Sequence, residues 1–137
     1  MAWAVLDTSV YIGHWEHGLY EGFLEDVRRA FVIRHSAVVL SELRRGARTR
    51  QAEERVGHLF RFARPGWEPS AEEWWRAGEL IRTIGDRAGW DTVKRRDFQN
   101  DALIALTARR HGAVVVTADR DDFERLARTL HIEVITP

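Results

Sequence analysis

The chain has 137 residues, 45% of them hydrophobic and 31% charged, a composition typical of one globular domain, which we expect to span residues 1–137. Its 21 basic and 21 acidic residues give zero net charge, so the charge balance does not by itself indicate nucleic-acid binding. Cysteine is absent, so we expect neither disulfides nor thiolate metal sites. No apolar run reaches the roughly 18 residues of a membrane span, and the N-terminus lacks a signal-peptide pattern. We therefore expect a cytoplasmic protein.

Short apolar segments alternate with helical patterns along the chain. The helical patterns are a turn over 10–13 that stops near Gly13, then helices over 19–30, 36–48, 50–64, 70–87, 101–110 and 120–130. The apolar segments predict strands at 2–6, 31–34, 113–116 and 132–135, and residues 89–96 read as a polar connection. This alternation predicts an α/β fold with a parallel sheet and helices on both faces, from which the helix pair 36–64 protrudes as a hairpin.

Two acids directly follow predicted strands. Asp7 comes after the strand 2–6, and Asp119 comes shortly after the strand 113–116. Because the carboxyl ends of parallel strands meet at one edge, where open α/β sheets carry their chemistry, we expect both acids at that edge. Each could instead only cap the helix that follows it.

Two further acids lie on helices next to predicted strands. Glu42 in the helix 36–48 and Asp101 at the start of the helix 101–110 could point at the same edge. Alternatively, Glu42 is a solvated partner of Arg45, and Asp101 only complements the helix dipole. Asp97, one turn before Asp101 on the same face, is either an accessory ligand or the opening residue of the helix.

Acids gathered at one edge repel one another. Two unit charges 4 Å apart repel by about 1 kcal/mol in water and by about 4 kcal/mol at an effective dielectric constant of 20. A bound cation relieves this repulsion, and oxygen ligands without cysteine suit Mg²⁺ or Mn²⁺. Such an ion positions a water as nucleophile and neutralises charge on a phosphoryl oxygen. The pattern therefore favours metal-assisted phosphodiester hydrolysis.

Four segments around these acids occur in a recognisable order and span almost the whole chain: Leu6–Val10, Ser36–Gly46, Asp101–Ala105 and Val116–Phe123. Together they resemble the PIN-domain family, and more narrowly the VapC-type ribonuclease toxins of bacterial toxin–antitoxin pairs. The resemblance implies a three-layer α/β/α sandwich with a short parallel sheet. It also implies a catalytic Mg²⁺ or Mn²⁺ site that is formed by Asp7, Glu42, Asp101 and Asp119. Thr117 matches the family's hydroxyl residue beside that site, and Ser9 and Asp122 are further candidates for its surroundings.

The same resemblance implies an activity and partners. The activity is endonucleolytic cleavage of single-stranded or looped RNA by a metal-activated water, which leaves 5′-phosphate and 3′-hydroxyl ends. The partners are a VapB-type antitoxin, whose tail covers the active groove, and a second copy of the chain in a homodimer.

Basic side chains flank the proposed acids in the sequence. Of the 21 basic residues 20 are Arg, whose planar fork suits phosphate, although genomic base composition also explains this usage. Candidate RNA contacts near Glu42 and Asp101 are Arg44, Arg45, Arg48, Arg50, Lys94, Arg95 and Arg96. The alternative is that these residues form a solvated helix face and a polar loop.

Aromatic side chains offer a second way to hold RNA. Bases could stack on Trp15, Trp67, Trp74, Trp75 or Trp90, and packing in the core or against a partner is the other interpretation. The histidines show no spacing of metal ligands, and the pair His14 and His17 is expected at the surface.

Other functions fit the sequence less well. A haloacid-dehalogenase-like phosphatase needs a second Asp two residues after the first, where this chain has Ser9, and a lysine after a late strand, where Lys94 is misplaced. Two alternatives stay open: a PIN nuclease of RNA maturation outside toxin–antitoxin systems, and a non-catalytic binding module of the same fold.

Overall fold

Four parallel strands lie at the centre of the structure, a computed structural model that describes residues 1–63 and 66–137. They are β1 (Trp3–Leu6), β2 (Val32–Arg34), β3 (Val114–Val116) and β4 (Val134–Ile135), hydrogen-bonded in the order β2-β1-β3-β4. The central strands β1 and β3 are apolar because helices cover both of their faces. Leu6 pairs with Val116, so these two strands end side by side at the same edge.

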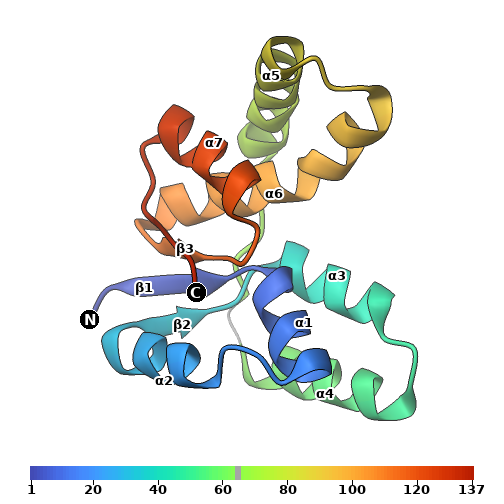
Figure 1. Cartoon of the computed structure of the whole chain (residues 1–137), viewed down its shortest axis with the longest axis vertical. Coiled ribbons are helices and arrows are strands. Elements are labelled where there is room, and N and C mark those ends of the chain that lie inside the picture. The colour runs from blue at the N-terminus through green and yellow to red at the C-terminus, as the bar shows by residue number, and fades with distance from the viewer. Residues whose placement is uncertain (64–65) are drawn as a thin grey trace.

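Helices cover both faces of this sheet (Figure 1). On one side lie α1 (Thr8–His17), α2 (Glu21–Ala30), α3 (Ala37–Gly46) and α4 (Arg50–Phe62); on the other lie α5 (Ala71–Ala88), α6 (Thr92–His111) and α7 (Arg120–Leu130). The predicted α/β class and three-layer arrangement are therefore confirmed. In the described part of the chain, no helix is long and apolar enough to cross a membrane.

The predicted hairpin of helices is present as α3 and α4, which pack against each other. It does not stand free of the body, because α3 also contacts α1 and α6 and buries Val39 and Leu43. Ser36 caps α3 as predicted, with its hydroxyl accepting from the Val38 backbone N–H. Residue 64, the predicted end of the second helix, lies outside the described residues.

The prediction that the first helical segment stops near Gly13 is wrong. Helix α1 continues to His17 and ends at Gly18, whose φ of 63° is the left-handed conformation that suits glycine. Gly13 has a different role, since a Cβ at this position would lie 2.5 Å from the Tyr20 ring. The glycine permits close packing of that ring against α1.

The prediction of a polar connection over 89–96 is also wrong for most of that segment. Helix α6 begins at Thr92, and the Asp91 carboxylate caps it by accepting from the Lys94 backbone N–H at 2.8 Å. Asp101 therefore lies in the middle of α6 and not in its first turn. Complementing the helix dipole, the alternative role for this acid, acts only near a helix end and does not apply here.

Candidate metal centre

Asp7 stands where β1 ends and is held by two hydroxyl groups. The Ser9 hydroxyl donates to Asp7 Oδ2 at 2.7 Å, and the Thr117 hydroxyl donates to the same oxygen at 2.9 Å. Parallel pairing of β1 with β3 accounts for this meeting, because Asp7 and Thr117 directly follow the paired residues Leu6 and Val116. The Asp7 side chain makes no cap hydrogen bond to α1, so the structure does not show the alternative capping role.

Backbone amides fix the direction of both hydroxyl groups. The Ala118 N–H donates to Ser9 Oγ at 3.0 Å, and the Asp119 N–H donates to Thr117 Oγ1 at 2.9 Å. Each hydroxyl therefore has its proton available for Asp7, which accepts both as a carboxylate. The described residues give the second oxygen, Oδ1, no hydrogen-bond donor, and this oxygen stays available to a ligand.

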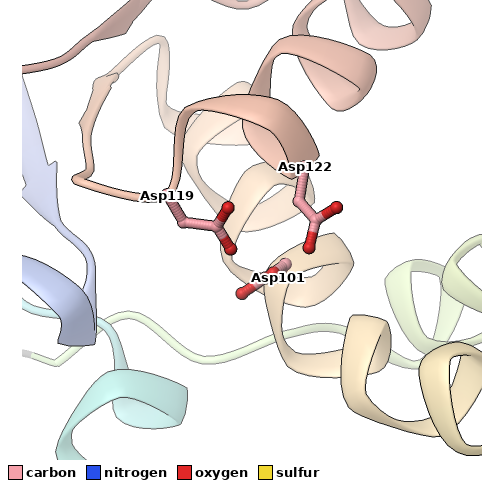
Figure 2. Close-up of side chains that lie close together, drawn as sticks. All are labelled: Asp101, Asp119 and Asp122. Carbon is pink, nitrogen blue, oxygen red and sulfur yellow. The ribbon is translucent and has the colours of Figure 1, made fainter.

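Three more carboxylates gather next to this pair of strand ends. Asp101 from the middle of α6 meets Asp119 and Asp122 from the start of α7, with one oxygen of each within 4.8 Å of the others (Figure 2). Asp119 occupies the N-cap position of α7, but its side chain makes no cap hydrogen bond. Asp122, expected from the sequence only in the surroundings of the site, lies in this group of three.

The pKa of Asp101 reflects its burial among the other carboxyl groups. Burial, and then the charges of Asp7, Asp119, Asp122 and Glu42, raise its pKa to about 8 from an ordinary value of 3.8. Burial and the neighbouring Asp122 charge likewise raise the pKa of Asp119. Four acids therefore act electrostatically on Asp101, although only two of them, Asp119 and Asp122, form the group within 4.8 Å with it.

Glu42 joins the site from α3, on the side of Asp7. Its Oε1 accepts a hydrogen bond from the Thr8 hydroxyl at 2.9 Å. Burial raises its pKa, the Thr8 hydrogen bond opposes the rise, and the Asp7 charge adds to it. Glu42 also interacts with the Asn100 side chain, and Arg45 has a smaller effect on it. Thr8 and Asn100 were not expected at the site, although each is the direct neighbour of a proposed ligand.

A single lysine faces the acids. The Lys94 ammonium lies 2.6 Å from Asp122 Oδ2 and 5.1 Å from the centre of the Trp90 ring. Its hydrogen bond to Asp122, together with the charges of Asp122, Asp119 and Asp101, raises its pKa. Lys94 is thus at the site itself, although the sequence suggested only that it flanked the site.

The arginines that follow Lys94 pair with acids outside the site. Arg95 pairs with Asp86 at 3.0 Å, donates to the Trp90 carbonyl and packs over Gly85, so it ties α6 to α5. Arg96 is exposed and lies 3.7 Å from Asp97, an exposed acid outside the cluster of carboxylates.

The basic residues near Glu42 lie at the end of α3 and beyond it. Arg44, Arg45 and Arg48 are exposed, and Arg44 lines a groove of about 660 Å³ between α3 and α4. Arg50 is also exposed and pairs with Glu54 at 3.2 Å.

The tryptophans divide between the interior and the surface. Trp67 is buried and stacks on His111 with ring centres 4.0 Å apart, and Trp90 meets Phe98 edge-on. Trp15 packs against Tyr11. Of the five candidates, Trp74 and Trp75 on α5 are the most exposed, at 50% and 85%, while Trp15 and Trp90 are half-buried.

The residues at this edge fit a hard divalent cation. Every donor is an oxygen, several carboxylates raise one another's pKa values, and one oxygen of Asp7 faces no donor from the described residues. A cation of charge two would relieve the repulsion that, after burial, contributes to the raised pKa of Asp101.

Comparison with known proteins now places the chain in a family. The sequence profile described as the PIN domain matches residues 4–129. The chain belongs to the PIN-domain family. The resemblance of the four acid-bearing segments is thereby confirmed, and no curated protein sequence gives a significant match.

Solved structures of toxin–antitoxin proteins share the fold of this PIN domain. VapBC2 from Rickettsia felis, bound to a promoter DNA fragment, is 23% identical, with 98% of each chain covered and a TM-score of 0.67. DNA-bound VapBC from Salmonella typhimurium is 24% identical over 99% of this chain and 98% of the other, with a TM-score of 0.65. VapBC-5 from Mycobacterium tuberculosis, a member of the VapBC family of toxin–antitoxin systems, is 23% identical over the full length of both chains, with a TM-score of 0.61.

Proposed function

We propose that this PIN domain is a divalent-metal-dependent endoribonuclease. The observation that carries the proposal is the meeting of five carboxylates from separate parts of the chain at the carboxyl edge of β1 and β3. Asp7, Glu42, Asp101 and Asp119 would hold Mg²⁺ or Mn²⁺, and Asp122 lies close enough to share in the site. Membership of the PIN-domain family supports a nuclease, and the donor set supports the metal.

The residues of the site have distinct tasks in this proposal. A bound Mg²⁺ or Mn²⁺ would acidify a water and neutralise charge on the phosphate. Ser9 and Thr117 donate to one oxygen of Asp7 and leave its second oxygen for the ligand. Glu42, whose pKa burial raises above its ordinary value, is suited to orient the attacking water and to accept its proton.

Cleavage of RNA by purified protein tests the proposal. We expect single-stranded RNA to be cut with Mn²⁺ and left intact with EDTA, giving 5′-phosphate ends. Asp7→Asn and Asp101→Asn keep the side-chain shape and should reduce the rate by roughly 100-fold or more, the scale of losing a group that acts on the transition state.

The matched control is Asp121→Asn, which makes the same change at an exposed position beside Asp122. It should cleave like the unaltered protein. RNA cleavage that survives EDTA, or that Asp7→Asn and Asp101→Asn leave unchanged, would refute the metal-dependent mechanism.

We further propose that the protein is the toxin of a toxin–antitoxin pair, with a VapB-type antitoxin as partner and a homodimer as its own assembly. The shared fold with VapBC proteins over nearly the whole chain supports this.

Induced expression of the unaltered protein in a bacterium should stop growth, and expression of the Asp7→Asn variant should not. Growth arrest by both forms would separate toxicity from the nuclease site, and light scattering would measure the mass of the assembly.

A further inference from the structure

Lys94 occupies a position that none of the other basic residues shares. Its ammonium is 2.6 Å from Asp122, which in turn lies within 4.8 Å of Asp101 and Asp119. Any group that binds between these carboxylates is therefore within close electrostatic range of the Lys94 nitrogen. Among the described residues, no other basic side chain forms an ion pair with this group of acids.

The ammonium is held in place yet still has hydrogen-bonding capacity. Asp122 on one side and the Trp90 ring at 5.1 Å on the other limit its movement. An ammonium has three protons to donate, and the described residues supply only Asp122 as an acceptor. The side chain is 40% exposed, so the remaining protons can reach a ligand that arrives from solvent.

The negative charge of the site favours a positively charged side chain close to the acids. The five carboxyl groups of the site offer more negative charge than one divalent cation can compensate. An RNA phosphate carries a further negative charge and would be repelled by this excess. Lys94 supplies a positive charge next to the acids, whereas Arg95 is engaged by Asp86 and Arg96 by Asp97.

The chemistry of lysine also suits this position. The chain uses Arg at every other basic position, so Lys94 is its only lysine. A guanidinium beside Asp122 would bind both carboxylate oxygens with its planar fork and direct fewer donors to a third group. The compact ammonium can contact Asp122 and a phosphate oxygen at the same time.

We propose that the Lys94 ammonium binds the scissile phosphate of the RNA at the acidic site. The proposal rests on the ribonuclease function proposed above and assigns a substrate contact to one residue of this chain. Lys94 carries the charge that admits the phosphate, and Asp122 and Trp90 position it.

Substitution of Lys94 in the full chain tests this assignment by kinetics and by metal binding. Lys94→Met removes the charge, Lys94→Arg retains it, and Arg109→Met removes a charge at the exposed far end of the same helix. Initial rates of RNA cleavage with Mn²⁺ give kcat and KM. Free Mn²⁺ measured by electron paramagnetic resonance gives metal affinity without RNA.

We expect Lys94→Met to lower kcat/KM by about 10–100-fold, the size of one charged hydrogen bond to substrate. Its Mn²⁺ affinity should be retained or increased, because a repelling charge has been removed. Lys94→Arg should recover part of kcat/KM, and Arg109→Met should match the unaltered protein in both measurements.

Two results would overturn the assignment. If Lys94→Met cleaves RNA as efficiently as Arg109→Met, Lys94 does not bind the phosphate. If Lys94→Met loses Mn²⁺ affinity in parallel with activity, Lys94 only holds Asp122 in place. Failure of the unaltered protein to cleave RNA with Mn²⁺ would instead refute the underlying ribonuclease function, and with it the substrate contact.

Discussion

Asp7 illustrates how single residues prepare the site before any ligand arrives. Two hydroxyls donate to one of its oxygens, and both take their direction from backbone amides at the end of β3. A carboxylate held in this way loses little conformational freedom when it binds a cation. The Ser9 and Thr117 hydroxyls thus determine which Asp7 oxygen a ligand meets.

Thr117→Val tests this arrangement with minimal change in shape. The substitution removes one of the two donors to Asp7, so we expect RNA cleavage or Mn²⁺ affinity to fall by about 10–100-fold. Thr107→Val is the matched control, since this buried hydroxyl donates only to the Leu103 carbonyl within α6. Equal loss of activity in the two variants would show that the effect is one of general packing.

Asp101 makes stability depend on pH in a direction that can be stated in advance. Its pKa in the fold is about 8 against 3.8 ordinarily, so the folded state holds the proton more tightly than the unfolded state does. The contribution of Asp101 to the free energy of unfolding is therefore fully present below pH 3.8, and it is lost as the pH rises through about 8.

The measurement is the melting temperature, in EDTA, between about pH 6 and about pH 9, a range that contains the folded pKa. We expect it to fall across this range in the unaltered protein and to fall less in Asp101→Asn, whose amide does not titrate. An identical pH dependence of the two proteins would contradict the raised pKa of Asp101.

At the scale of elements, α6 brings together a cation and an acid. Lys94 and Asp101 are seven residues apart, close to two helical turns, so both lie on one face of α6. That face meets the start of α7, where Asp119 and Asp122 lie. The first three turns of α6 are therefore part of the site and not a connection that leads to it.

The packing of α1 gives a prediction about stability. Gly13→Ala would place a Cβ 2.5 Å from the Tyr20 ring, so the ring must shift. We expect a loss of about 1–3 kcal/mol in the free energy of unfolding, the usual result of overpacking. Gly78→Ala on α5 meets nothing within 4 Å and should instead stabilise by about 0.5–1 kcal/mol.

Chemical denaturation measures both free energies. If Gly13→Ala were as stable as Gly78→Ala, the close approach of the Tyr20 ring to α1 would not be required by the fold.

The sequence predicts the elements well where a local signal decides them. The strand 113–116 and the cap at Ser36 are examples. The prediction of a helix end at Gly13 is wrong, because the residue type alone does not distinguish a glycine that permits close packing from a glycine that ends a helix. The sequence also fails to predict the start of α6 at Thr92. The Asp91 cap there is a local signal, but the segment has few apolar residues, and two of its side chains are held by the more distant acids Asp86 and Asp122.

For the whole molecule, the sheet order accounts for the part of the site that the sequence predicts. Asp7 and Asp119 were expected at one edge because each follows a strand, and the adjacent pairing of β1 and β3 places them there. The pairing of Lys94 with Asp122 was not predicted, because it depends on how α6 packs against α7. The residues next to either side chain in the sequence do not indicate this packing.

The central claim is that acids distant in the sequence form one cation site, and the melting temperature with and without Mn²⁺ tests it most directly. At a Mn²⁺ concentration about 100 times Kd, linkage predicts a gain of about 2.7 kcal/mol, or about 5–10 °C for a chain of this size. Asp101→Asn should lose most of this shift, and Asp121→Asn should keep it. A melting temperature of the unaltered protein that does not change with Mn²⁺, or an equal rise in Asp101→Asn, would contradict the claim.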